Sequence, residues 1–376
     1  MTDEPMKEEK RNDEVRSSED RALDRFTELM INKISTLKED WHKPWFTEGT
    51  LSWPKNMSGR EYNGMNALML MMECEQKGYR IPVFMTFDRI QKLNAEDPEL
   101  PHLSVTRGEK SFPVFITTFT VVHDETKEKI KFDDYKQLTA DEQAKYHVYP
   151  KLKVYNVFNV DQTNISEARP EMYDILKLEN LPPERKATQG MPFDFLPVDR
   201  MIEQNRWICP ILPQHQDDAY YSISKKQIVV PEKTQFKDSE SYYGTIFHEM
   251  VHSTGAEEQL NRLKPAPFGS AEYAREELVA ELGSALIATR YGMEKHLKDD
   301  SAAYLKNWLD QLHESPEFLK TTLLDVKKAS AMVTGKVDAL NQEIQAEVKQ
   351  QNESTQEQER ELEPALEEEE SHGYHR

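Results

Sequence analysis

Residues 242–255 of the chain read YYGTIFHEMVHSTG. On an α-helix, residues four positions apart point the same way, so His248 and His252 would present two imidazoles to one point. Zn²⁺ takes nitrogen and oxygen donors at about 2 Å, and a catalytic zinc site keeps one coordination position open. Glu249 follows the first histidine and could take a proton from a water molecule held there. The stretch therefore predicts a catalytic zinc site, with His248 and His252 as metal ligands and Glu249 as general base.

A second helix is expected to complete this site. Residues 273–281 read YAREELVAE and supply further carboxylates. Glu277 and Glu281 are four positions apart and share a helix face, so one can bind the metal while the other orients a histidine. We favour Glu277 as the third ligand and keep Glu281 as the orienting residue or the alternative ligand. The competing interpretations are a solvated acidic face and two incidental histidines, but Leu278 and Leu282 indicate a partly buried helix.

The segment around this motif is predicted to be mostly helical, with a small sheet. Helices are expected at about 197–207, 239–254, 271–291, 301–313 and 316–342. Ser239 or Asp238 would cap the helix that carries the histidines. The residues at 219–223 and 227–230 favour a hairpin that turns at 224–226.

The N-terminal half is predicted to be a mixed, strand-rich unit, which makes the whole chain α+β. Apolar residues recur at helical spacing over 20–39, and a second helix is expected at 63–77, ending at Gly78. The stretches PVFITTFTVV at 113–122 and KVYNVFNV at 153–160 are typical of strands. Residues 133–145 are polar and helix-prone, and the prolines of 165–195 place the domain junction there.

Composition favours a cytoplasmic protein of two domains with no membrane partner. The chain has 376 residues and a net charge of −20. Residues 343–376 hold 11 acidic and 3 basic residues, whereas residues 21–170 hold 22 and 21, so the nearly neutral N-terminal half could still bind a nucleic acid. There is no long apolar run and no secretory signal, and Cys74 and Cys209 suggest no disulfide framework.

The C-terminal half resembles the zincin-type metallopeptidase domain of ArdC-like antirestriction proteins, which plasmids and conjugative elements encode. The resemblance rests on residues 242–255 and continues through 261–263, 268–270, 273–285 and 304–309. It implies His248 and His252 as ligands, Glu249 as general base, and a carboxylate from 276–281 as third ligand. The peptide substrate is not implied, because a fold hosts many functions.

The N-terminal half resembles the single-stranded-DNA-binding domain that precedes the peptidase in this family. The resemblance is carried by residues 41–45, 56–66, 105–110 and 155–163. Single strands are bound by cations that contact phosphates and by aromatic rings that stack on bases. The candidate DNA-binding residues are Lys55, Arg60, Tyr62, Arg107 and Lys110. The competing interpretation is that the aromatic residues belong to the core and that the cations are simply solvated.

These observations predict four segments: a disordered tail at 1–19, a single-stranded-DNA-binding domain at 20–170, a zincin-like metallopeptidase domain at 171–342, and an acidic tail at 343–376. The acidic tail is expected to be either solvated chain or a fraying helix with no packing face. The expected function is that of a mobile-element antirestriction protein that binds single-stranded DNA and carries a zinc peptidase-type site. The alternative is a zinc-dependent protease that acts on a host or element-encoded protein, with DNA binding absent or used only for recruitment. A purely structural zinc ion is a third possibility.

Overall fold

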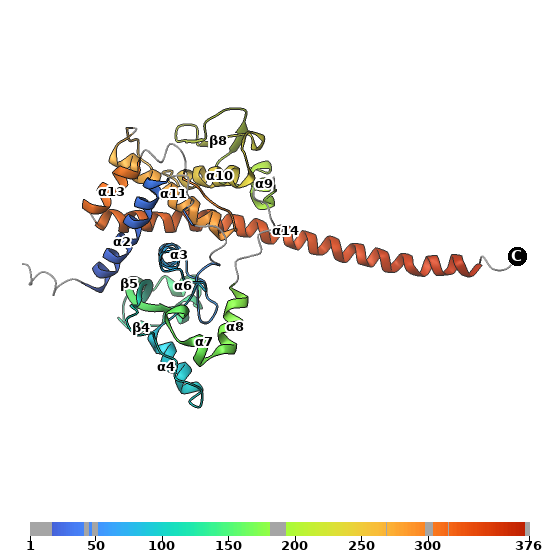
Figure 1. The fold of residues 1–376 in the computed structure, drawn as a ribbon. Helices are drawn as coiled ribbons and strands as arrows, with labels where there is room; N and C mark the ends of the chain where they lie inside the picture. The colour runs from blue at the N-terminus through green and yellow to red at the C-terminus, as the bar shows by residue number, and fades with distance from the viewer. Residues whose placement is uncertain are drawn as a thin grey trace, which may run out of the picture.

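The computed structural model describes residues 17–40, 45–46, 52–180, 193–267, 269–297, 304–314 and 316–372. The fold is mixed α+β, as the sequence predicted, with a sheet unit below a layer of helices (Figure 1). A disordered tail was predicted at 1–19, and residues 1–16 of it lie outside the described residues. Residues 18 and 19 belong to a helix, so the predicted tail ends too late. Among the described residues, no helix combines the length and the apolar character needed to cross a membrane.

The N-terminal sheet has five strands in the order β1-β2-β5-β3-β4. Their bounds are β1 Lys55–Asn56, β2 Val83–Met85, β3 Phe112–His123, β4 Lys129–Ile130 and β5 Tyr146–Asn159. β3 and β5 form a long antiparallel ribbon, whose register runs from Phe112 opposite Val157 to His123 opposite Tyr146. Both strands expected from the β-branched runs are present, and β5 begins seven residues before the predicted start at 153.

Several helices surround this sheet. They are α2 (Ser18–Glu39), α3 (Met65–Lys77), α4 (Phe87–Glu96), α5 (Phe132–Lys136), α6 (Ala140–Gln143), α7 (Ile165–Ala168) and α8 (Pro170–Glu179), with a 3₁₀ turn, η1, at Val160–Gln162. α2 begins with a capping box between Ser17 and Asp20, and α3 ends at Gly78, whose φ is 69°. α4, α7 and α8 were not predicted from the sequence. The prolines of the junction were taken as breakers, yet Pro170 occupies the first turn of α8, where no backbone N–H is needed.

The C-terminal half has a small three-stranded sheet in the order β6-β8-β7, followed by long helices. The strands are β6 (Ile211–Gln214), β7 (Tyr220–Ser222) and β8 (Gln227–Pro231), and the predicted hairpin is the antiparallel β7–β8 pair. The helices are α9 (Leu196–Glu203), α10 (Ser239–Ser253), α11 (Ala271–Arg290), α13 (Leu305–Glu314) and α14 (Pro316–His372), with a 3₁₀ turn, η2, at Lys233–Gln235. Asp238 is the N-cap of α10, and its side chain accepts a hydrogen bond from the Ser241 amide.

The last helix, α14, continues well beyond the packed segment predicted at 316–342. It has 57 residues and includes much of the acidic tail, so of the two alternatives left open for that tail, the helix holds through His372 (Figure 1). Its first half is anchored by buried Leu319, Leu323, Val326, Val333 and Val337, which recur at helical spacing. From residue 345 to 354 the side chains are exposed, and the Glu, Gln and Lys residues there favour helix without a packing face.

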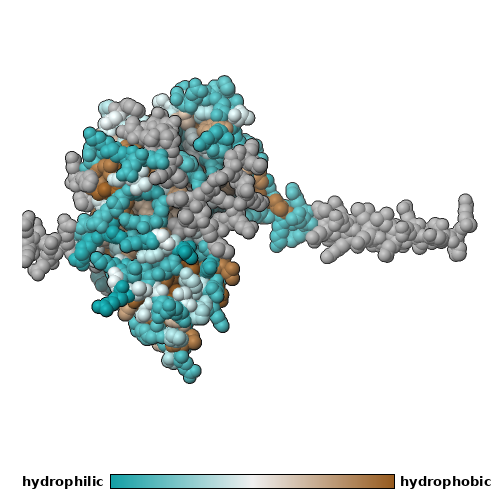
Figure 2. Space-filling model, viewed as in Figure 1, coloured by the Kyte–Doolittle hydropathy of each residue, from teal (hydrophilic) through white to brown (hydrophobic). Residues whose placement is uncertain are grey.

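One hydrophobic core joins the two halves of the chain. α2 packs against α13 and α14, so the first helix of the N-terminal half belongs by its contacts to the upper helical layer. A smaller core, which contains Ile81, Val83 and Ile90, lies on the sheet side, where α4, α7 and α8 gather. The surface of the view in Figure 2 is mostly hydrophilic, and apolar side chains appear there only in small, separate patches.

Candidate metal centre

The site forms where α10 crosses α11. Gly283 lies on α11 at a close approach to α10, because a Cβ added there would sit 3.0 Å from Cγ2 of Val251. Val251 is the residue before His252, so this approach brings the histidine turn of α10 against the carboxylates of α11. His248 and Glu281 are fully buried, while His252 and Glu277 keep a small exposed fraction.

Three side chains converge on one point. The Nε2 atoms of His248 and His252 are 3.1 Å apart. Glu277 places Oε2 3.4 Å from Nε2 of His248 and Oε1 3.7 Å from Nε2 of His252. These three residues form the group of possible ligands found in the described part of the chain, with donor atoms within 4.8 Å of one another.

This geometry fits a zinc ion. Four donors held about 2 Å from one metal at tetrahedral angles lie roughly 3.3 Å apart. The two imidazole nitrogens are 3.1 Å apart, and the two oxygens of Glu277 lie 3.4 Å from one of them and 3.7 Å from the other, which is close to that value. Two imidazole nitrogens and one carboxylate oxygen are also a donor set that zinc accepts in catalytic sites.

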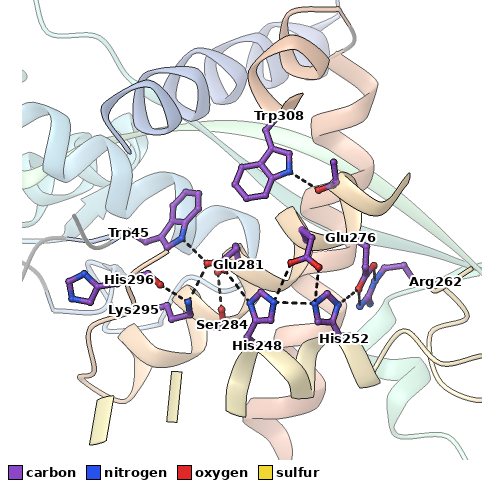
Figure 3. Close-up of polar contacts among 12 residues, drawn as sticks. Trp45, His248, His252, Arg262, Glu276, Glu281, Ser284, Lys295, His296 and Trp308 are labelled. Carbon is purple, nitrogen blue, oxygen red and sulfur yellow. Dashed lines mark hydrogen bonds and ion pairs between the residues drawn. The ribbon is translucent and has the colours of Figure 1, made fainter. Parts of the chain in front are cut away.

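Each imidazole has a carboxylate against its other nitrogen (Figure 3). Oε1 of Glu276 lies 3.1 Å from Nδ1 of His252 and Oε1 of Glu281 lies 3.3 Å from Nδ1 of His248. Such contacts favour a proton on Nδ1, which leaves the Nε2 lone pair for a metal. Glu281 therefore lies where the orienting residue was expected, and Glu277 lies where the ligand was expected.

Glu276 is a site residue that the sequence analysis missed. Arg262 donates two hydrogen bonds to it, from Nε to Oε2 at 2.7 Å and from Nη2 to Oε1 at 2.9 Å. Burial alone would raise the pKa of Glu276, but the hydrogen bonds from Arg262 and His252 outweigh it, and the net pKa is lowered. Glu276 is thus held as a carboxylate against His252. Because Arg262 lies in the loop between the two helices, spacing alone could not pair it with Glu276.

A cavity of about 470 Å³ opens beside the three converging side chains. Its walls include Glu249, His252 and Glu277, together with Tyr220 and Tyr221 of the edge strand β7. Tyr273 also lines it and hydrogen-bonds to Glu277; burial is the main cause of its raised pKa, so the phenol stays protonated. Glu249 is buried within the fold and borders the same cavity as His252 and Glu277.

The candidate DNA-binding residues lie on the sheet unit, away from this cavity. Arg60, Arg107 and Lys110 are exposed and Lys55 is half-buried on β1. Gly59 and Gly108 have φ values of 79° and 95°, so both turns use a backbone conformation that favours glycine.

Tyr62 requires a correction. Its side chain is 8% exposed and packs edge-on against Phe84, so its ring is not available to stack on a base. Burial also raises the pKa of Tyr62 far above its ordinary value. Tyr62 lies two positions after the exposed Arg60, and the sequence gave no sign of which of these two side chains would point inward.

The fold and this site define a zincin-like metallopeptidase domain, and residues 200–322 match the family of that description. Residues 20–158 match the N-terminal domain of the anti-restriction factor ArdC. The chain is therefore ArdC-like, with an ArdC N-terminal domain followed by a zincin-like metallopeptidase domain, as the sequence resemblance indicated.

Relatives share this arrangement over most of the chain. A DNA primase TraC of Escherichia coli is 28% identical over 315 residues, which cover 81% of this chain and 26% of that protein. The uncharacterized protein y4eC of Sinorhizobium fredii (strain NBRC 101917 / NGR234) is 27% identical over 79% of this chain and 86% of its own length. The chain thus spans about a quarter of that TraC protein.

Solved structures show the same fold. The metal-free crystal structure of the antirestriction ArdC protein from plasmid R388 has a TM-score of 0.57 at 24% identity, covering 84% of this chain and 98% of that one. The Mn(II)-bound structure of the same protein has a TM-score of 0.57 at 23% identity, covering 83% and 97%. A zincin-like fold implies a metal, and the residues described above could hold it.

Proposed function

We propose that the C-terminal half is a zinc-dependent peptidase. The observation that carries this proposal is the convergence of the Nε2 atoms of His248 and His252 on the carboxylate of Glu277, which places one oxygen within 3.7 Å of each nitrogen. Bound zinc would act as a Lewis acid and would lower the pKa of a water molecule. Glu249 would accept a proton at its carboxylate from that water and later pass it to the departing amine.

The cavity supports a peptide as the substrate. β7 is one of the two edge strands of its sheet, and its Tyr220 and Tyr221 line the cavity. An extended peptide can add to such an edge through main-chain hydrogen bonds. In that position its carbonyl groups would pass in front of Glu249 and Glu277.

Glu249→Gln tests the peptidase chemistry directly. We expect the variant to keep its zinc content, measured by metal analysis, and to lose hydrolysis of an unfolded protein such as casein by at least about 100-fold. Glu257→Gln is the control, because it changes an exposed carboxylate just beyond α10. Full activity of Glu249→Gln would refute the assigned role, and a wild-type protein without bound metal would refute the zinc proposal itself.

We further propose that the N-terminal half binds single-stranded DNA and that the protein has an antirestriction role for a mobile element in the cytoplasm. The match to the ArdC N-terminal domain and the exposed Arg60, Arg107 and Lys110 support this. Bound protein would shield an incoming single strand from host nucleases. We retain 20–170 and 171–342 as the proposed limits of the two functional units.

Fluorescence anisotropy with labelled oligonucleotides tests DNA binding. We expect the protein to bind single-stranded DNA more tightly than double-stranded DNA, with an affinity that falls as the salt concentration rises. Loss of one phosphate contact should reduce the slope of log affinity against log salt concentration by about 0.7. The double variant Arg60→Ala/Arg107→Ala should bind more weakly, while Lys225→Ala, an exposed change on the β7–β8 turn, should not. No binding at low salt would leave the protease, acting on a host or element-encoded protein, as the main function.

A further inference from the structure

Trp45 comes from the N-terminal half of the chain, but its side chain contacts Glu281 of the candidate metal centre. It is fully buried and belongs to the large core that joins the two halves. Residues 20–158, which include it, match the ArdC N-terminal domain, whereas the metal-centre helices belong to the zincin-like match. Figure 3 shows its indole pointing at Glu281, beside His248.

Two hydrogen bonds fix Trp45 to this place. Its indole Nε1 donates to Oε2 of Glu281 at 3.3 Å. Its backbone amide donates to the carbonyl of Lys295 at 3.0 Å. The Nζ of Lys295 donates to the same Oε2 of Glu281, also at 3.3 Å. Trp45 therefore contacts Glu281 directly through its indole. Through its backbone it also fixes Lys295, which is the second donor to Glu281.

The packing around Lys295 leaves little freedom for an alternative arrangement. Lys295 is 9% exposed, and its Cδ would lie 3.0 Å from a Cβ added at Gly244. Gly244 is one turn before His248 on α10, so the absence of a side chain there makes room for the lysine stem. The carboxylate of Glu281 thus receives two donors on Oε2 while Oε1 faces Nδ1 of His248.

We propose that Trp45 is a positioning residue of the metal centre, and that the N-terminal half thereby completes the site of the peptidase half. By anchoring Oε2 of Glu281, the indole orients Oε1 toward His248. That contact keeps the imidazole rotated with Nε2 toward His252 and Glu277. Outer contacts of this kind change metal affinity by about 10- to 100-fold when they are removed. This inference rests on the proposed metal site but assigns a residue from outside the peptidase motif.

Trp45→Phe in the full-length protein tests the proposal, because it removes the indole N–H and keeps an aromatic ring. We expect zinc affinity, measured by competition with a chelating dye, to fall about tenfold. We also expect the visible absorption bands of the cobalt(II)-loaded protein to shift, since they report ligand geometry. Trp308→Phe is the control: Trp308 is equally buried, but its indole donates to the carbonyl of Ala274 and not to a carboxylate of the site.

A double-mutant cycle separates positioning from loss of stability. Glu281→Gln should weaken zinc binding, and adding Trp45→Phe to it should have little further effect, because the indole acts through Glu281. The apo forms of the two tryptophan variants should lose similar thermal stability.

If Trp45→Phe binds zinc and shows cobalt bands as the wild type does, or if its effect simply adds to that of Glu281→Gln, the inference is wrong. If Trp45→Phe does not fold, Lys295→Met, which removes the other donor to Glu281, must show the same coupling. A wild type that binds no metal would instead refute the proposed peptidase site.

Discussion

Three glutamates on one turn and a half of α11 have different surroundings, and these surroundings separate their roles. Glu276 is paired with Arg262 and faces Nδ1 of His252. Glu277 faces the Nε2 atoms of both histidines and the cavity. Glu281 is buried against Lys295 and Trp45. The same side-chain type can therefore serve as ligand or support, depending on which partner occupies its other oxygen.

Removing Glu277 or Glu281 should have unequal effects on the metal. We expect Glu277→Ala to abolish stoichiometric zinc binding, because a proposed ligand is lost, and Glu281→Ala to retain zinc with an affinity about 10- to 100-fold weaker. Metal analysis after gel filtration and a zinc titration would measure both. Glu272→Ala, an exposed carboxylate on the same helix, is the control. The reverse order of effects would make Glu281 the ligand.

At the scale of elements, α2 packs on both the sheet unit and the helical layer, and an aromatic cluster joins it to the sheet. Phe26 is fully buried, and its ring lies 5.5 Å from that of Phe112 and 5.4 Å from that of Phe115. α2 also packs on α13 and α14. An amphipathic pattern in the sequence predicted this helix but could not indicate that it has two partners.

Phe26→Ala should therefore destabilise the whole chain. We expect the free energy of unfolding to fall by about 3–5 kcal/mol, because a fully buried aromatic ring is lost and leaves a cavity. Urea denaturation followed by circular dichroism would measure it. Phe119→Ala removes a ring that is 38% exposed on the β3–β5 ribbon and should cost much less. Equal losses would show that α2 does not anchor the two layers.

A half-buried ion pair between α2 and α3, in which only the glutamate is fully enclosed, should make stability depend on pH. Nη2 of Arg25 lies 2.9 Å from Oε2 of Glu73, which is 4% exposed. Burial raises the pKa of Glu73 by more than Arg25 lowers it. A carboxyl whose pKa is raised on folding contributes stability below its unfolded pKa, and this stability is lost as pH rises through the folded pKa.

Glu73→Gln isolates that contribution. We expect the melting temperature of the variant, relative to the wild type, to rise between pH 4 and pH 7, because the wild type must ionise a buried group over this interval. Thermal unfolding at several pH values would show it. Glu75→Gln, a nearby carboxylate paired with Lys33, serves as the comparison. A relative loss of stability at pH 7 would mean that the attraction to Arg25 outweighs burial.

At the scale of the molecule, α14 has a packed part that is followed by exposed residues at 345–354. Its buried residues extend to Ile344. Two ion pairs then tie it to α9 and the loop after it, Arg206 with Glu343 at 2.7 Å and Arg200 with Glu347 at 2.6 Å. Beyond them, side chains through residue 354 are exposed, and Figure 1 shows the helix running clear of the body.

Truncation should divide α14 at this point. A chain that ends at residue 354 should keep the wild-type melting temperature, because the removed segment follows the exposed residues 345–354 and runs clear of the body (Figure 1), and a helix that packs on nothing contributes little to stability. A chain that ends at residue 331 loses Val333, Val337, Leu340 and Ile344 from the core and should be destabilised by several kcal/mol. Differential scanning calorimetry would compare the two. A large fall in the melting temperature of the chain that ends at residue 354 would indicate that the segment beyond it stabilises the fold.

Much of the secondary structure could be predicted from local pattern. The helices at 20–39, 239–254 and 271–291 and the hairpin at 219–230 follow from periodicity, caps and β-branched runs, which are properties of neighbouring residues. α4, α7 and α8 were missed because their start signals, Thr86 and Pro170, also occur in loops and turns. Whether α14 continues into the acidic tail was left open, because a polar helix has no apolar stripe to distinguish it from solvated chain.

The sequence alone determined that His248 and His252 face one point and that Glu277 and Glu281 share one face of α11. Both follow from the four-residue spacing of each pair, because the direction of a side chain on a helix depends only on its position along the helix. Only the tertiary structure decided which carboxylate meets which nitrogen, because that depends on the crossing of α10 and α11 at Val251 and Gly283. It also decided that Tyr62 is buried and that Trp45 reaches Glu281 across 236 positions of the chain. Contacts between residues so far apart arise from packing, and no local pattern records them.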